Sequence, residues 1–179
     1  EPDSSAMDMI FDFPNLIILK SLSKSYGIPG LRLGYAVSGN RDMMTELRSH
    51  LPIWSINSLA QYFLENIGGY QQQFAESCAK VRRATQLLSS GLQGIPYLHP
   101  YPTQGNFVLS RLLYGLTATE LTTRLFEDFK ILINDCSRKR GLDGRFVRMA
   151  SRTVEENAQL VQALQALGAT IPAEGRVYG

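Results

Sequence analysis

A lysine set among small hydroxyl residues is the first part of this sequence that could do chemistry. Lys24 lies between Ser23 and Ser25, shortly after Ser21, and Arg32 follows in a glycine-rich bend. The amine of a lysine becomes able to form Schiff bases with carbonyl compounds when desolvation or a nearby cation lowers its pKa. Arginine offers a bidentate fork to a phosphate, and serine hydroxyls add hydrogen bonds. The pattern indicates amine chemistry beside an anionic ligand. The alternative is a surface lysine and a structural arginine in a hairpin.

Arg148 is a second candidate, in the run Gly144-Arg-Phe-Val-Arg-Met-Ala150. Side chains alternate along a strand, so Phe146, Arg148 and Ala150 share one face. We therefore expect Arg148 to be buried among apolar residues, where an arginine without an anion costs several kcal/mol. Two interpretations remain open. The guanidinium forms an internal ion pair with an aspartate or glutamate, or it binds the carboxylate of a substrate.

Short strands and capped helices are expected to position both groups. Apolar runs at 16–19 and 33–37 predict strands on either side of the lysine turn. Helical spacing, with caps at Thr117 and Thr153 and a glutamate three residues after each, predicts several helices. The expected helices are 41–50, 58–67 (ending at Gly68-Gly69), 70–92, 117–129 and 154–167. The expected strands after residue 94 are 97–99, 105–110, 131–133 and 146–150, with a polar loop at 134–143.

This order of elements predicts an α/β protein with two parts. The strands and helices after residue 94 form an α+β unit, and the long helix joins it to what precedes. We place the boundary near residues 68–70, so that residues 1–69 form one part and residues 70–179 the other.

Composition excludes several classes of protein. The chain has 179 residues, 44% hydrophobic and 19% charged, with a net charge of +2, which does not favour nucleic acid or a membrane surface. Two cysteines without CxxC spacing and two histidines argue against a common zinc framework or a disulfide scaffold, and indicate a cytoplasmic protein. No apolar run approaches the roughly 20 residues of a membrane span, and the start is not a signal peptide. Because the chain does not begin with methionine, we expect it to be part of a longer protein.

The run SLSKSYGIPGLRLGY closely resembles the cofactor-lysine signature of fold-type I pyridoxal-phosphate enzymes, in particular class I and II aminotransferases of the histidinol-phosphate aminotransferase type. The resemblance implies that Lys24 forms the internal aldimine with the cofactor aldehyde, and that Ser21, Ser23 and Arg32 hold the cofactor phosphate. It also implies the carboxy-terminal part of that fold, which is the end of the large domain followed by the small domain.

A second stretch, GLDGRFVRMASRTVEEN, is similar to the segment of these enzymes whose arginine binds the substrate α-carboxylate. The resemblance implies that Arg148 is this carboxylate-binding arginine. Asn106 matches the asparagine of the family's Asn-Phe strand, where it could line the site or make a structural hydrogen bond. Asn134 stands where histidinol-phosphate aminotransferases usually have an arginine for the substrate phosphate. An asparagine cannot pair a dianion as an arginine does, so Asn134 argues against histidinol phosphate as substrate.

The resemblance implies a homodimeric enzyme that transfers an amino group between an α-amino acid, or a related amino-phosphate, and a keto acid. Freed Lys24 would move a proton from the substrate Cα. Threonine-phosphate decarboxylases share Gly-Leu-Asp-Gly and the carboxylate arginine, so decarboxylation is an alternative reaction, and a non-catalytic assembly module is an alternative function.

The family residues that bind the cofactor ring lie upstream of the lysine and are not found here, so we expect the chain alone to be inactive. The spacing of Gly27, Gly30 and Gly34 fits neither common nucleotide-binding motif.

Overall fold

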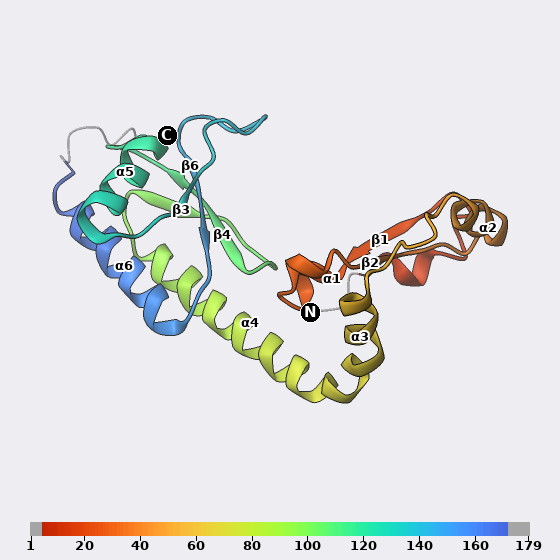
Figure 1. Cartoon of the computed structure of the whole chain (residues 1–179). Coiled ribbons are helices and arrows are strands. Elements are labelled where there is room, and N and C mark those ends of the chain that lie inside the picture. The colour runs from red at the N-terminus through yellow and green to blue at the C-terminus, as the bar shows by residue number, and fades with distance from the viewer. Residues whose placement is uncertain (1–4, 172–179) are drawn as a thin grey trace. The chain divides into compact units, whose positions relative to one another are not determined.

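The computed structural model describes residues 5–171. By its internal contacts the chain divides into two compact units, Glu1–Phe74 and Ala75–Gly179, which we call the first and the second unit and describe separately (Figure 1). The division falls inside helix α4 (Gln71–Gln93), a few residues after the position expected from the sequence. Within the described range, no helix is both long enough and apolar enough to cross a membrane.

A two-stranded antiparallel ribbon holds the lysine turn of the first unit. Strand β1 (Ile18–Ser21) pairs with β2 (Gly34–Val37), with Ser21 opposite Gly34. The strand expected at 16–19 is therefore displaced toward the lysine, because the ladder with β2 sets its limits. A side chain at Gly34 would place a Cβ 2.7 Å from the Lys20 carbonyl oxygen, so only glycine lets the two strands approach at this point.

Helices of the first unit begin at asparagine caps. Asn40 Oδ1 accepts from Met43 N at 3.0 Å, and Asn57 Oδ1 accepts from Ala60 N at 2.9 Å. The expected helix break at Gly68-Gly69 is confirmed, because these glycines lie in a short 3₁₀ turn that separates α4 from the preceding α-helix. The elements are η1 (Ala6–Met9), α2 (Arg41–Ser49), α3 (Ser58–Asn66) and η3 (Ile67–Tyr70).

The first unit buries little apolar surface. Within its described part, the buried hydrophobic residues are Ile10, Leu33 and Ala60. A small aromatic group adds contacts, since Tyr26 stacks on Phe74 with ring centroids 4.2 Å apart. Large apolar side chains lie in solvent, including Leu19 at 79% exposed, Ile53 at 95% and Trp54 at 91%.

The second unit contains a four-stranded antiparallel sheet in the order β3-β4-β6-β5. Val108, Leu112, Val147 and Met149 point to one face and are fully buried. The strands are β3 (Leu98–Pro100), β4 (Phe107–Leu112), β5 (Asn134–Asp135) and β6 (Phe146–Ala150).

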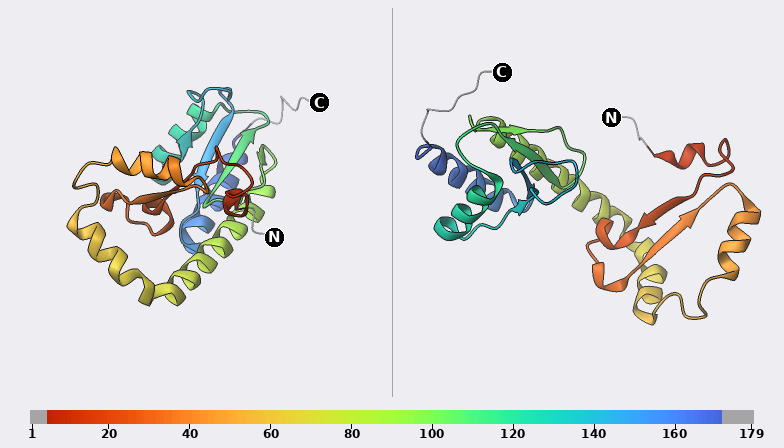
Figure 2. Two further views of the ribbon diagram at one scale, coloured as in Figure 1. Left: turned by 90° about the vertical axis from the view of Figure 1, so that its right-hand side faces the viewer. Right: turned by 90° about the horizontal axis from the view of Figure 1, so that it is seen from above.

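Three helices cover that buried face (Figures 1 and 2). They are the carboxy-terminal part of α4, α5 (Ala118–Phe129) and α6 (Val154–Gly168). Both predicted capping boxes are present, Thr117 with Glu120 and Thr153 with Glu156. Within the described part of the second unit, no helix covers the opposite face of the sheet, and we call it the open face.

The prediction of a strand at 131–133 is wrong. Lys130 ends α5 in the left-handed conformation with φ 59°, and Ile131 N then donates to Leu125 O. Ile133 is buried in the core and Ile131 packs against it, whereas Leu132 is 75% exposed, and none of the three is part of the sheet. Strand β5 forms only where residues 134–135 meet β6, inside the segment expected to be a loop.

Candidate active site

One helical turn, α1 (Leu22–Ser25), presents Lys24 directly after β1. Backbone hydrogen bonds close the turn on both sides. Leu22 N donates to Leu33 O at 3.0 Å, and Ile28 N donates to Ser23 O at 2.9 Å. Ser23 is buried, whereas Lys24 is exposed and its side-chain amine makes no hydrogen bond or ion pair with the described residues. The turn therefore fixes the backbone and leaves the amine free to meet a ligand.

Ser21, Ser23 and Arg32, the predicted phosphate ligands, line one hollow of about 390 Å³ in the first unit. Lys20 also lines it, whereas Lys24 does not. The structure therefore brings the three anion-binding candidates together, with Lys24 beside them on the same turn.

The backbone of Arg32 is held in the left-handed region with φ 52°, at the end of η2 (Pro29–Leu31). Its Nη1 donates to Pro29 O at 3.0 Å, which ties the guanidinium to the bend. Asn57 Nδ2 donates to Leu31 O at 3.1 Å. Asn57 is also the N-cap of α3, and an asparagine directly before a helix is a cap that a sequence can indicate. Its second bond, to a loop far away in the sequence, could not be seen there.

A phosphate fits this donor set chemically. The hydroxyls of Ser21 and Ser23 make no hydrogen bond with the described residues, so both can donate to an anion, and Arg32 has no carboxylate partner there. Charge-assisted hydrogen bonds of this kind are the common way in which proteins hold phosphate. The first unit can thus supply part of a phosphate cradle.

Arg148 lies on the open face of the sheet and is exposed, so the expectation that it is buried is wrong. Val147 and Met149 fill the core in its place. Alternation could not decide between the faces, because both carry apolar residues. Arg148 keeps no ion pair with residues 5–171, so the internal ion-pair interpretation has no partner there. Its guanidinium stands 5.1 Å from the centre of the Phe107 ring, a cation–π contact.

Asn106 lies just before β4, next to Phe107. Its carbonyl accepts a hydrogen bond from Ser151 N at 2.8 Å, which ties the start of β4 to the end of β6. Its side chain is exposed. Asn106 and Arg148 thus belong to one sheet of the second unit. Lys24 and its neighbours belong to the first unit.

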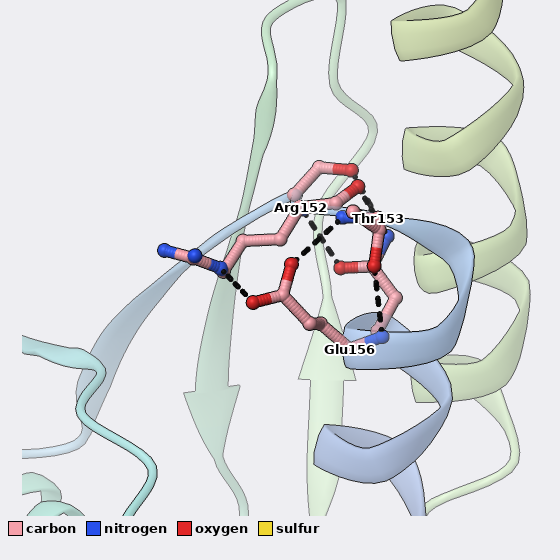
Figure 3. A network of polar contacts seen from close by, with 5 residues as sticks. Arg152, Thr153 and Glu156 are labelled. Carbon is pink, nitrogen blue, oxygen red and sulfur yellow. Dashed lines mark hydrogen bonds and ion pairs between the residues drawn. The ribbon is translucent and has the colours of Figure 1, made fainter.

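The end of β6 is held by the polar network in Figure 3. Arg152 Nε donates to Glu156 Oε1 at 2.8 Å, and Thr153 N donates to Glu156 Oε2 at 3.2 Å. The hydrogen bond from the Thr153 backbone, followed by the one from Arg152, holds the pKa of Glu156 below its ordinary value. This network starts α6 and fixes the strand that carries Arg148.

Asn157 is a positioning residue that the sequence analysis missed. Its Oδ1 accepts from Arg152 N at 2.9 Å, and its Nδ2 donates to Ala84 O at 3.2 Å and Ser151 Oγ at 3.1 Å. It is buried, so one side chain joins α4, α6 and the end of β6. A polar residue on the apolar stripe of α6, one turn before Leu160, was the available signal.

Comparison with known proteins gives consistent results. A model of the family described as aminotransferase class I and II matches residues 6–164. A CMP-5'-(3-aminopropyl)phosphonate synthase from Streptomyces rubellomurinus is 38% identical, over 92% of this chain and 27% of that protein. An L-serine phosphate decarboxylase from Campylobacter jejuni is 35% identical, over 86% of this chain and 40% of that protein.

Among solved structures, the histidinol-phosphate aminotransferase from Clostridium acetobutylicum is similar with a TM-score of 0.87 at 25% identity. The likeness covers 96% of this chain and 51% of that chain. The chain therefore spans between about a quarter and about a half of the proteins to which it is similar.

Proposed function

Because the chain belongs to the aminotransferase class I and II family, we propose that it forms the carboxy-terminal part of a pyridoxal-phosphate-dependent enzyme. In this proposal residues 1–69 are the end of the large, cofactor-binding domain, and residues 70–179 are the small domain. The enzyme moves an amino group between an α-amino acid and a keto acid. The observation that carries the proposal is the unpartnered amine of Lys24, beside a hollow lined by Ser21, Ser23 and Arg32.

Each residue has a defined task in this proposal. Ser21, Ser23 and Arg32 bind the phosphate of the cofactor and so hold it beside Lys24. Pyridoxal phosphate supplies an aldehyde for amines and a ring that accepts the electron pair left at the substrate Cα. The Lys24 amine binds the resting cofactor and, once free, takes the proton from Cα.

Arg148 receives the substrate carboxylate. Its position supports this role, because the guanidinium is exposed, has no carboxylate partner among the described residues, and is steadied by Phe107. A bidentate clamp on the carboxylate orients the Cα–H bond for proton removal. Asn106, at the start of the neighbouring strand, is the second residue proposed to line the substrate site.

The test is covalent labelling in the complete enzyme that contains this chain, and in the chain itself. Pyridoxal phosphate is added, the adduct is reduced with borohydride, and the modified lysine is identified by mass spectrometry. We expect Lys24 to be labelled before any other lysine, Lys24→Ala to lose this label, and Lys20→Ala to keep it. Equal labelling of Lys20 and Lys24 contradicts the assignment.

Decarboxylation is a second candidate reaction, favoured by the likeness to the L-serine phosphate decarboxylase. The two reactions share the lysine and the carboxylate arginine, so the site residues do not decide between them. Release of carbon dioxide without a keto-acid acceptor indicates decarboxylation. Amino transfer that requires the acceptor indicates transamination.

A homodimer is part of the proposal, and a non-catalytic assembly role is its alternative. Ile53 and Trp54 are almost fully exposed in the segment between α2 and α3. Exposed apolar side chains in one place support a face that further polypeptide covers. Analytical ultracentrifugation of the complete enzyme tests the dimer, and labelling at Lys24 separates the catalytic role from assembly alone.

A further inference from the structure

We propose that a cavity in the helical layer of the second unit binds a free α-amino acid with an apolar side chain. The cavity has a volume of about 480 Å³ and is lined by the connection between β4 and α5, one side of α5 and the residues after α6 (Figure 1). This volume is typical of small-molecule sites. The helices lie on the buried face of the sheet, whereas Arg148 lies on the open face, so the inference does not rest on the proposed function.

One wall of the cavity is apolar and closely packed. Gly115 has φ 82°, and a Cβ at this position would overlap Cγ2 of Ile171. Only glycine therefore lets the connection between β4 and α5 pass so close to Ile171. Leu116 and Ile171 are half-buried and pack against the core of the second unit. A ligand in the cavity meets an apolar surface that the core supports.

The other wall carries a carboxylate and a guanidinium one helical turn apart. Glu120 and Arg124 are four residues apart on α5, a spacing at which such side chains commonly pair. In the described part of the chain they form no ion pair. The capping box holds the carboxylate instead, since Glu120 Oε2 accepts from Thr117 N and from Thr117 Oγ1, both at 2.8 Å. The two charges stay apart, and a ligand can bind between them.

Three polar groups of this wall are free to bind a ligand. Glu120 Oε1, the Thr123 hydroxyl and the Arg124 guanidinium line the cavity without a hydrogen bond to the residues that the structure describes. Hydrogen bonds from the backbone and then from the hydroxyl of Thr117 lower the pKa of Glu120. Its carboxylate is therefore charged at pH 7, and the wall offers one negative and one positive group.

A free α-amino acid matches this arrangement. Its ammonium group binds Glu120, and its carboxylate binds the Arg124 guanidinium and the Thr123 hydroxyl. Its apolar side chain covers Leu116 and Ile171. A simple anion would lie beside the negative charge of Glu120, and a simple cation beside the positive charge of Arg124. The paired charges of the wall therefore favour a zwitterion over either.

The test is an NMR titration of the isotopically labelled chain with L-leucine at pH 7. We expect saturable shifts of the backbone amide signals of residues 115–124. Three further probes each lack one feature: glycine lacks the apolar side chain, N-acetylleucine the ammonium group and leucinamide the carboxylate. Each should bind about tenfold more weakly than leucine. The absence of saturable shifts with leucine overturns the proposal, and so does acetate that binds as tightly as leucine.

Variants assign the contacts one by one. Arg124→Ala should weaken leucine binding about tenfold, and Thr123→Val about threefold. Glu120→Gln keeps a capping-box residue but removes the charge, so it should weaken leucine about tenfold without weakening N-acetylleucine. Arg140→Ala, at an exposed arginine in the loop before β6, is the matched control and should bind leucine like the wild type. Wild-type leucine binding in both Arg124→Ala and Glu120→Gln rejects the site.

Arg148→Ala separates this cavity from the proposed substrate site. The shifts of residues 115–124 should persist in Arg148→Ala, because Arg148 lies on the opposite face of the sheet. If these shifts disappear, leucine binds on the open face and the cavity proposal is rejected, while the carboxylate role of Arg148 is retained. If they persist in Arg148→Ala and are lost in Arg124→Ala, the second site is established whatever the outcome for the proposed function.

Discussion

The second unit closes a core of its own, whereas the first unit leaves much of its apolar surface in solvent. Leu88, Leu121, Val147 and Leu164 come from four different elements and meet in the second unit's core. The first unit has a two-stranded ribbon, which by itself is marginal in water. The lysine turn is therefore held by local hydrogen bonds, and Arg148 by a packed sheet. The proposed cofactor-binding turn and the proposed substrate arginine are therefore stabilised to different degrees.

Hydrogen exchange of the whole chain should show the largest difference between the units. Amides of β4 and β6 are protected by the core, so we expect them to exchange on the order of a thousandfold more slowly than those of β1 and β2. Exchange followed by two-dimensional NMR measures this. Equal protection would show that the first unit is stabilised as well as the second.

A matched pair of leucine truncations sharpens the comparison. Leu164→Ala opens a cavity in the core of the second unit and should lower the free energy of unfolding by about 2–5 kcal/mol. Leu19→Ala removes a side chain that is exposed on β1, and should change the free energy of unfolding by less than about 0.5 kcal/mol. Urea titration gives both values. A large loss in Leu19→Ala would mean that this side chain is covered in solution.

Each unit has an asparagine that joins distant segments, and we expect the removal of these side chains to cause a smaller difference in stability. Asn157→Ala removes the acceptor of the Arg152 N–H and the bond to Ala84 O, and should cost about 1–3 kcal/mol. Asn57→Ala removes a helix cap and an exposed bond to Leu31, and should cost about 1 kcal/mol. Gln159, exposed on α6, gives the control Gln159→Ala. The free energy of unfolding of each variant is measured by urea titration. Equal losses in Asn157→Ala and Asn57→Ala would contradict this order.

Acid should produce the smallest effect, and we expect it at the two capping boxes of the second unit. Hydrogen bonds from the Thr117 and Thr153 backbones hold the pKa values of Glu120 and Glu156 below the ordinary 4.5. Because these pKa values are lowered in the folded state, the stabilisation is present above pH 4.5 and is lost as pH falls through the lowered values. The caps of the first unit are neutral asparagines.

Melting temperatures measured between pH 7 and pH 3 test this expectation. Glu156→Gln should flatten the loss of stability on acidification, and Glu120→Gln should do the same. If neither variant alters the slope of the pH profile, the capping boxes do not link stability to pH.

Local features could be predicted from the sequence. Both capping boxes need only residues three positions apart, and the limits of β6 follow from its flanking loops. The lysine turn is likewise a continuous run. These elements depend on short-range hydrogen bonds and steric preferences, which the neighbouring residues determine.

Features that depend on distant partners could not be predicted. The face of β6 on which Arg148 lies is set by the helices that cover Val147 and Met149, and alternation alone allowed either face. Strand β5 starts at Asn134 because β6 is there to pair with it. The bonds of Asn157 to Ala84 join residues far apart in the chain.

Trp54 makes the difference between the two units visible by fluorescence. It is the single tryptophan of the chain, it belongs to the first unit, and it is 91% exposed. An indole in water emits at longer wavelength than one covered by protein, so tryptophan fluorescence reports on the first unit alone. The molecule thus carries a built-in probe at the unit whose apolar surface is least covered.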